Sequence, residues 1–475
     1  MDMKKSSPII LVAAAMYDPR KILVGEKEIY PMSNIVNAGL LGLATLLDEA
    51  GYSKVKMFQG KQIADIFREM NESGVDLGKM EHPILLSIPS FFAIEWANDF
   101  CDVVRGTNPD LKIAAGGRWT IDSNLDWIKK KMPQVNFFAL GCSDDVIEKI
   151  VDPANWSEFR TPQSARKPFS KLNYRLLNDF QKYHPIIDIG RGCPNRCSFC
   201  LESSQKYGFS SFKSPQEIVN QIQQINEQYG ENMGYYFMSS YFNPTEKWAI
   251  EFAELYTSNK LKSNWGVQAR ADEINPSTVE ILGKAGLRTV DLGLESASME
   301  QLLRMNKTKD PEEYLRKSEH LLKVISKSDT DTMLNLMPFP GETHKTLEET
   351  EMWLEKNKMY IKGVRGSPFR IFMNGGHTAS LIKLTESLSG RKTDMACLEK
   401  NGFVSPDLSK EISNAEASEW CYNMKRKYNT ANPKPNRYHH QVQSTLYGRH
   451  FTVSDARHAS GFPLGSSVDG EHGQT

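Results

Sequence analysis

Short apolar segments alternate with amphipathic helical segments along most of this 475-residue chain, and no other feature constrains the fold as strongly. In the first 150 residues, strands are expected at 9–16, 53–58, 84–88, 111–115 and 135–140. Helices are expected at 34–50, which Gly51 ends, and at 94–104. Buried strands separated by helices predict an α/β domain at residues 1–150 with a doubly wound, Rossmann-like parallel sheet.

The alternation resumes at Ile186. Before it, residues 151–180 are rich in Pro, Ser, Arg and Lys and lack periodicity, so they are expected to form a linker. Two helix starts, at 214–217 and 310–313, combine a capping residue with a proline at the first helical position. Strands are expected at 186–189, 235–238, 265–269, 289–294, 332–337 and 369–372. Six such units within residues 181–380 predict a partial (β/α)6 TIM-type barrel, a fold that carries its chemistry on the loops after the strands.

Residues 381–460 are charged and mainly helical in pattern, and they are expected to cover the barrel and to contribute substrate contacts. The small, polar segment 461–475 is expected to be disordered. Lys plus Arg equal Asp plus Glu at 58 each, so bulk charge does not favour binding to nucleic acid or to an anionic membrane. The locally basic segment 425–440 is short, and we interpret it as a solvated helix end.

The longest apolar run, Ile9–Met16, is too short to span a bilayer. Seven cysteines, an odd number, do not suggest a disulfide framework. We therefore expect a cytoplasmic protein. We also expect it to be a monomer.

Three of the cysteines, Cys193, Cys197 and Cys200, fall within eight positions, in the loop directly after the first expected barrel strand. The other four are isolated in the sequence: Cys101, Cys142, Cys397 and Cys421. Structural zinc sites usually take four protein ligands, and a zinc site with three cysteines lacks a nearby His-Glu partner motif here. A [4Fe–4S] cluster held by three thiolates leaves one iron open to an exogenous ligand. Three structural cysteines on a surface loop remain the alternative.

The spacing Cys193-x3-Cys197-x2-Cys200, with Phe199 before the third cysteine, resembles the signature of the radical S-adenosylmethionine (radical SAM) superfamily. The segments 264–272, 282–286, 292–296, 302–307 and 337–343 resemble the branch that also contains cobalamin-dependent methylases and methylthiotransferases. The resemblance implies a [4Fe–4S] cluster on the three cysteines, with SAM chelating the fourth iron. It also implies SAM contacts from Phe199, Ser239, Ser240, Arg270, Glu295 and Met337.

Two of these residues keep a purely structural alternative. Glu295 could cap the helix that begins near Ser298, and Arg270 could belong to a surface ion pair. The sequence also departs from the family pattern after the second barrel strand, where Ser239 and Ser240 stand in place of a Gly-Gly-Glu-like element.

Residues 33–150 resemble the cobalamin-binding-type domain that precedes the barrel in this branch, through segments 37–47, 115–120 and 138–145. The usual cobalt-ligating D-x-H-x-x-G motif is absent, because Gln59-Gly60-Lys61-Gln62 follows the second strand. The domain therefore either binds cobalamin without a histidine ligand or has lost the cofactor. Cobalamin contacts are expected at the carboxyl ends of the strands, from Ser87, Ser90, Gly116 and Gly117.

The resemblance implies a radical SAM enzyme, foremost a cobalamin-dependent methyltransferase acting on an unactivated carbon of a small metabolite or peptide in specialised metabolism. A reductant such as flavodoxin or ferredoxin would supply the electron. One alternative is a cobalamin-independent radical enzyme that carries out cyclisation, oxidation or sulfur insertion. Another is a tRNA-binding or structural iron–sulfur protein. Tyr241 and His377, the latter expected on the loop beyond the sixth barrel strand, are candidate catalytic residues, with His439 and His440 as weaker ones.

Overall fold

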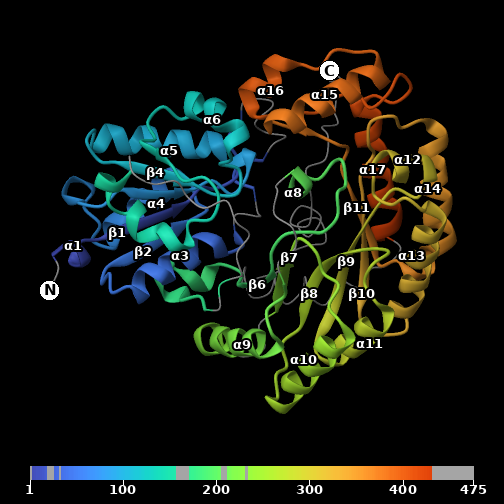
Figure 1. Ribbon diagram of the computed structural model, residues 1–475, viewed down its shortest axis with the longest axis horizontal. Helices are drawn as coiled ribbons and strands as arrows, with labels where there is room; N and C mark the ends of the chain where they lie inside the picture. Colours follow the sequence, from blue (N-terminus) through green and yellow to red (C-terminus); the bar gives the residue numbers. More distant parts are fainter. Residues whose placement is uncertain are drawn as a thin grey trace, which may run out of the picture.

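The computed structural model describes residues 3–18, 26–30, 34–156, 169, 171–204, 211–230 and 234–430. Two parallel sheets dominate it, and they lie side by side with a group of C-terminal helices across one end (Figure 1). Residues 157–168 and 170 of the expected linker, His439, His440 and the expected disordered tail lie outside the described residues.

The first sheet has the strand order β2-β1-β3-β4-β5 and is entirely parallel. Its strands are β1 (Ile9–Ala13), β2 (Val55–Gln59), β3 (Ile84–Ser87), β4 (Ile113–Gly116) and β5 (Phe137–Phe138). Its helices are α1 (Met3–Ser6), α3 (Ala38–Glu49), α4 (Ile63–Glu72), α5 (Ile94–Thr107), α6 (Leu125–Lys131) and α7 (Ile147–Ile150). Helix α3 packs on one face of the sheet, while α4 and α5 pack on the other. The doubly wound, Rossmann-like arrangement expected from the sequence is confirmed.

The second sheet has the order β11-β10-β9-β8-β7-β6 and is also entirely parallel. Its strands are β6 (Ile186–Gly190), β7 (Tyr235–Ser239), β8 (Trp265–Arg270), β9 (Leu287–Glu295), β10 (Asp331–Leu336) and β11 (Gly363–Gly366). Its helices are α8 (Leu201–Ser204), α9 (Pro215–Tyr229), α10 (Glu246–Ser258), α11 (Pro276–Lys284), α12 (Met299–Arg304), α13 (Pro311–Ile325) and α14 (His344–Asn357). Six parallel strands with helices on the outer face form the expected partial barrel (Figure 1).

The prediction of the sixth barrel strand at 369–372 is wrong. That strand is β11, whereas Ile371–Phe372 forms β12, which pairs antiparallel with β13 (Phe403–Val404). Strand β11 contains one large apolar residue, Val364, between glycines, so its sequence offers no apolar run to detect. Pairing with β10 and packing against α17 (Asn414–Thr430) hold it instead.

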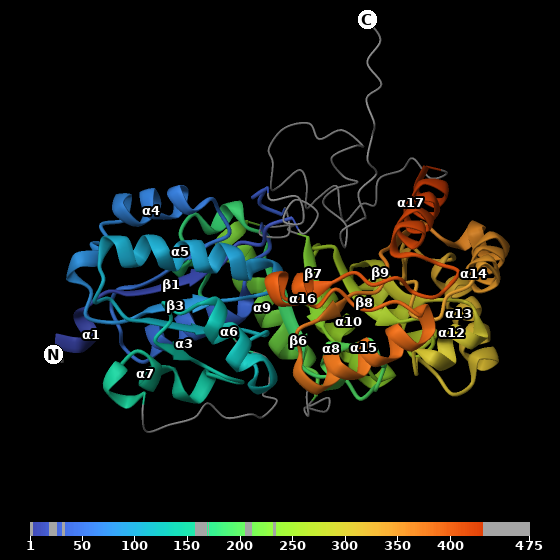
Figure 2. The ribbon, with the colours of Figure 1, turned by 90° about the horizontal axis from the view of Figure 1, so that it is seen from above.

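The C-terminal region is mainly helical over its described part, as expected, with α15 (Gly375–Ser389) and α16 (Met395–Asn401) before α17. It contacts both the first domain and the barrel. The Ser123 hydroxyl donates to Asn374 Oδ1 at 2.8 Å, and Trp127 Nε1 donates to the Glu399 carbonyl at 2.9 Å. Figure 2, the view from above, shows α16 next to the first domain and α17 next to the barrel. The C-terminal region therefore bridges the two domains.

Two further contacts join the carboxyl ends of the two sheets. Arg118, just after β4, forms an ion pair with Glu202, which follows the cysteine loop. Arg191, just after β6, forms an ion pair with Asp144 of the first domain at 3.5 Å. The edges at which α/β sheets bind ligands thus face each other in this molecule. In the part of the chain that the structure describes, no helix combines the length and apolarity needed to cross a membrane.

Candidate functional site

The cysteine loop begins where β6 ends and is anchored from the far side of the barrel mouth. The Ser198 amide donates to the Met305 carbonyl at 2.8 Å, and the Ser198 hydroxyl donates to the Arg304 carbonyl at 3.1 Å. Within the loop, the Cys200 amide donates to the Cys197 carbonyl at 3.1 Å. Cys197 is buried, while Cys193 and Cys200 are partly exposed. The loop is therefore held in place by its own backbone and by the segment after α12.

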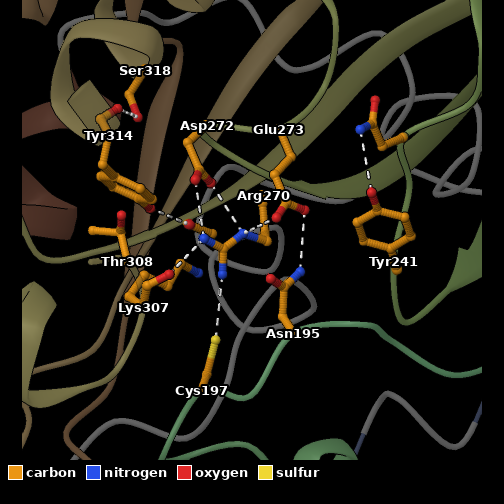
Figure 3. Close-up of polar contacts among 12 residues, drawn as sticks. Asn195, Cys197, Tyr241, Arg270, Asp272, Glu273, Lys307, Thr308, Tyr314 and Ser318 are labelled. Carbon is orange, nitrogen blue, oxygen red and sulfur yellow. Dashed lines mark hydrogen bonds and ion pairs between the residues drawn. The ribbon is translucent and has the colours of Figure 1, made fainter. Parts of the chain in front are cut away.

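Arg270, the last residue of β8, is the centre of the polar network drawn in Figure 3. Its Nη1 donates to Cys197 Sγ at 3.4 Å, and its Nε and Nη2 each lie 3.0 Å from an oxygen of Asp272. Burial alone would lower the pKa of Arg270, but hydrogen bonding to Asp272 and the charges of Asp272 and Glu273 raise it. A permanent cation thus points at a cysteine sulfur, as expected beside a thiolate.

A second donor lies beside Cys193. Asn195 Nδ2 is 3.7 Å from Cys193 Sγ, and it also donates to Glu273 Oε2 at 3.1 Å. Glu273 in turn lies 3.3 Å from Arg270 Nε (Figure 3). Burial raises the pKa of Glu273, while Arg270 and Asn195 act in the opposite direction. Asn195, Glu273 and Arg270 therefore form one continuous network that reaches two of the three cysteines.

Glu295 ends β9 with a φ of 64°, which is rare for a residue with a side chain. Lys307 Nζ lies 3.1 Å from Glu295 Oε1, and the lysine side chain is only 4% exposed. The Glu295 carbonyl accepts a hydrogen bond from the Met337 amide at 2.9 Å. Backbone strain of this kind clusters at functional sites. Glu295 pairs with Lys307, and Ser298 occupies the N-cap position of α12, so the expected alternative that Glu295 caps this helix is wrong.

The residues around the cysteines suit a negatively charged iron–sulfur cluster. Burial raises the pKa of the Cys197 thiol, and the positive charges of Lys307 and Arg270 lower it. Within the described part of the chain, no three His, Cys, Asp or Glu side chains converge on a point where a single metal ion could bind. A [4Fe–4S] cubane binds each thiolate at a different iron, so its ligands need not converge in this way. Cys193, Cys197 and Cys200 would hold the cluster, with Arg270 and Asn195 as hydrogen-bond donors to its sulfur ligands.

The other expected SAM residues lie around the same barrel mouth. Lys307 Nζ is 5.8 Å from the centre of the Phe199 ring, and Phe199 packs with Met337 in one apolar cluster. Ser239 ends β7, where its hydroxyl donates to the Tyr241 carbonyl and accepts from the Tyr241 amide at 3.3 Å. Ser240 is exposed. The structure thus brings Phe199, Met337, Arg270 and Glu295 together, whereas the Ser239 hydroxyl serves a local turn.

The two candidate catalytic residues have different surroundings. Tyr241 stands at the side of the network in Figure 3, and its hydroxyl accepts from Asn243 Nδ2 at 3.2 Å. Burial and the nearby charges of Glu273 and Cys193 raise its pKa. The expectation that His377 lies in a loop is wrong, because it lies in the first turn of α15. Burial lowers the pKa of His377, and no described group lies within hydrogen-bond distance of its Nε2.

The expected cobalamin residues gather at the carboxyl edge of the first sheet. Ser87 and Gly116 are paired in register, and Ser87 Oγ accepts a hydrogen bond from Asn37 Nδ2 at 3.1 Å. Gly117 has a φ of 122°, and a Cβ there would lie 2.5 Å from the Ile88 carbonyl oxygen. Ser90 caps the short 3-10 turn that leads into α5. A glycine is therefore required at 117, where two backbone segments approach closely.

The loop after β2 has no histidine, and Gln59, the last residue of β2, comes directly before it. Gln59 is buried, and its side chain donates to the Ile35 carbonyl at 2.6 Å and accepts from the Asn37 amide at 2.8 Å. The side chain thus ties β2 to the segment before α3. It satisfies backbone groups that would otherwise be open at the sheet edge.

Four residues of the network were not singled out from the sequence: Asn195, Asp272, Glu273 and Lys307. Lys307 and Asp272 end motif segments that carry the family resemblance, so those motifs held a usable signal for them. Asn195 lies inside the cysteine loop, and Glu273 follows Asp272 directly. For these two residues the sequence holds no periodicity or spacing that marks them.

Comparison with protein families identifies residues 187–354 as a radical SAM superfamily domain. Among curated proteins, the chain is 28% identical over 172 residues to the anaerobic magnesium-protoporphyrin IX monomethyl ester cyclase of Cereibacter sphaeroides; the match covers 35% of this chain and 27% of that protein. It is 23% identical over 261 residues to the tRNA-2-methylthio-N(6)-dimethylallyladenosine synthase of Desulfitobacterium hafniense, covering 52% of this chain and 56% of that protein. The chain thus matches between about a quarter and somewhat over half of the length of these relatives.

Two solved structures share the architecture of both domains. The radical SAM methyltransferase TsrM from Kitasatospora setae, with tryptophan substrate and a SAM analogue bound, has a TM-score of 0.58 at 15% identity, covering 80% of this chain and 76% of that one. The cobalamin-dependent SAM radical enzyme OxsB, with aqua-cobalamin bound, has a TM-score of 0.64 at 16% identity, covering 88% of this chain and 66% of that one. At these identities the likeness establishes the fold.

Proposed function

From the radical SAM domain at residues 187–354, we propose that this chain is a radical SAM enzyme that acts on a small metabolite or peptide. The observation that carries the proposal is the contact between the Arg270 guanidinium and Cys197 Sγ at the carboxyl end of the barrel. A permanent cation held by two carboxylates and aimed at a sulfur suits a thiolate that ligates iron. A structural thiol would not need it.

The bound cofactors would supply the chemistry, because one electron from a reduced [4Fe–4S] cluster cleaves SAM into methionine and a 5′-deoxyadenosyl radical. The chain's own residues bind and orient. Cys193, Cys197 and Cys200 hold the cluster, while Arg270 and Asn195 donate to its cysteine sulfurs. The Lys307–Glu295 pair presents a partly exposed carboxylate at the barrel mouth, suited to the hydroxyl or ammonium groups of SAM. A small reduced protein of the flavodoxin or ferredoxin type would deliver the electron.

We further propose that the reaction is a cobalamin-dependent methyl transfer. Two features support it: the likeness in fold to TsrM and OxsB over 81% and 88% of this chain, and the carboxyl edges of the two sheets that face each other across the Arg118–Glu202 pair. Cobalamin would then lie along the edge that Ser87, Ser90, Gly116 and Gly117 form. It would bind without a histidine ligand from the loop after β2, where Gln59 is engaged with backbone groups. The lack of a histidine in that loop is also compatible with the second candidate, a radical SAM enzyme that works without cobalamin.

The test is anaerobic reconstitution with iron and sulfide, followed by dithionite and SAM. We expect a brown protein with about four irons per chain. It should form 5′-deoxyadenosine, and Cys193→Ala, Cys197→Ala and Cys200→Ala should each abolish this product. Cys421→Ala is the matched control, since Cys421 is fully buried away from the loop. A protein that binds zinc and forms no 5′-deoxyadenosine would contradict the proposal. An absorption spectrum after expression with added cobalamin separates the methyltransferase from the cobalamin-independent candidate.

A further inference from the structure

The inner face of the barrel is polar and partly open. Along β7 and β8 the side chains of Tyr235, Phe237 and Val267 pack outward into the main apolar core. Because side chains alternate along a strand, their neighbours Tyr236, Met238 and Gln268 face the inside of the barrel. Met238 is 39% exposed and Gln268 is also exposed, although both lie in strands of a six-stranded sheet. Solvent therefore reaches the inner face next to these strands.

Asp291 lies on this inner face, in the middle of β9, and is only 6% exposed. Its Oδ2 accepts hydrogen bonds from Tyr236 OH at 3.1 Å and from Arg365 Nη1 at 2.8 Å. Tyr236 lies on β7 and Arg365 on β11, each two strands away from β9 and on opposite sides. Side chains from strands on either side of β9 can reach the same atom only on the concave face of the curved sheet, where the strands converge. Asp291 therefore points into the barrel.

The two oxygens of the Asp291 carboxylate differ in their hydrogen bonding. Oδ2 has two donors, whereas no donor among the described residues lies within hydrogen-bond distance of Oδ1, which is itself buried. A buried carboxylate oxygen without a donor is costly, and a charge pair kept for stability alone would be expected to satisfy both oxygens. The adjacent inward-facing side chain on β8 is Gln268, which is paired in register with Asp291 and is exposed.

We propose that Asp291 Oδ1 is a substrate-binding group, and that the substrate inserts an N–H or O–H donor into the barrel. This inference rests on the proposed function and adds to it the chemical class of substrate, an amine or an alcohol. The ion pair with Arg365 keeps the surroundings of Asp291 close to neutral, so the group that enters need not carry a charge. A flat apolar molecule would leave Oδ1 without a partner and is disfavoured.

The position of Asp291 is consistent with this role. It lies four residues before Glu295 on the same strand, which corresponds to about 13 Å along the strand. Gly293 stands between them, and a Cβ there would come within 2.7 Å of Glu295 Oε1 and 3.3 Å of Lys307 Nζ. The Lys307–Glu295 pair at the mouth and Asp291 deeper inside thus belong to one face of the barrel.

The experiment measures the binding of three small probes to the full-length protein by ligand-observed saturation-transfer NMR. The probes are butylamine, 1-butanol and 2-butanone, which has an acceptor but no donor. We expect butylamine, 1-butanol or both to bind in millimolar concentrations and 2-butanone not to bind. Asp291→Asn should weaken butylamine binding about 10- to 100-fold, the effect of one charge-assisted hydrogen bond. If 1-butanol alone binds, the substrate donor is assigned to a hydroxyl.

Glu319→Gln is the matched control, because Glu319 pairs with Lys356 at 2.8 Å on the outer helices. It should leave probe binding unchanged. Should Asp291→Asn fail to fold, the double variant Asp291→Leu with Arg365→Met removes both charges together and leaves neither unpaired. Equal binding of the donor probes to wild type and Asp291→Asn, or equal binding of 2-butanone, would overturn the inference. Failure of wild type to form 5′-deoxyadenosine would instead contradict the proposed function and leave the binding result standing.

Discussion

Replacing Arg270 should destabilise the barrel far more than replacing an arginine on its surface. The Arg270 side chain is 12% exposed, and its carboxylate partners Asp272 and Glu273 are 14% and 25% exposed. Arg270→Ala would leave both carboxylates without this cation in a largely buried position. Breaking a buried pair in this way costs about 3 to 5 kcal/mol. For a domain of this size, a loss of that order lowers the melting temperature by about 6 to 20 °C.

Arg270→Lys separates charge from geometry. A lysine keeps the positive charge, but one ammonium group cannot bind Asp272 through two parallel hydrogen bonds and reach Cys197 Sγ as well. We expect a loss of about 1 to 2 kcal/mol, the contribution of one or two hydrogen bonds. In the reconstituted protein, losing the donor to Cys197 should also lower the reduction potential of the cluster, because hydrogen bonds to the sulfurs stabilise the more negative, reduced state.

The assay is thermal melting of the unreconstituted chain, followed by potentiometric titration of the reconstituted one. Arg316→Ala is the control, since Arg316 forms its ion pair with Glu313 on the exposed surface of α13 and its loss should leave the melting temperature unchanged. If Arg270→Ala melts together with Arg316→Ala, the buried network contributes nothing to stability. If Arg270→Lys leaves the potential unchanged, the Arg270–Cys197 contact does not act on the cluster.

Three further outcomes follow from single positions. Gly117→Ala should destabilise the first domain and abolish any cobalamin absorbance, because its Cβ would lie 2.5 Å from the Ile88 carbonyl oxygen; Gly106→Ala, in open space on α5, should raise the melting temperature. Burial raises the pKa of Glu342 from 4.5 to about 7, so the unfolded chain loses this proton first and melting temperatures should fall as pH rises from 4.5 to 7; Glu342→Gln should remove part of that fall. Glu295→Gly should melt higher than Glu295→Ala because it relieves the positive φ, while equilibrium dialysis should find SAM binding weakened in both.

The apolar pattern of the sequence predicted those strands that are themselves made mostly of apolar residues. Segment 84–88 is buried on both faces and segment 265–269 on its outer face, and their strands lie within a residue or two of the expected bounds. The sixth barrel strand failed this criterion, because Gly363 and Gly366 are small for a tertiary reason. A Cβ on Gly363 would meet Met333, and one on Gly366 would meet Cys421. The position of β11 therefore depends on the neighbouring side chains that pack against its glycines, and its own residues show no apolar pattern that could predict a strand.

The residues of the candidate site also differ in whether the local sequence could reveal them. Cys193, Cys197 and Cys200 are adjacent in sequence, so spacing alone marked them. Arg270 and Glu295 were found only through a family resemblance. Asn195 and Glu273 were not found, because the hydrogen bond that joins them spans 78 residues of sequence. Asp291 shows the limit most clearly. In the expected strand 289–294 it is the single charged residue, and its partners Tyr236 and Arg365 lie 55 and 74 residues away.

The contacts between the domains determine what a reaction at this site can use. Arg118 follows β4 and Glu202 follows the cysteine loop, so their ion pair brings the edge of Gly116 and Gly117 next to the segment that would bind the cluster. Arg118 is 51% exposed, and an exposed pair of this kind is worth little by itself. The spacing of the two edges must therefore be set by buried contacts, foremost the apolar core that runs from α3 to β6. In the proposed methyl transfer, a methyl carrier on the first edge and a radical source on the second would therefore act on one substrate held between them.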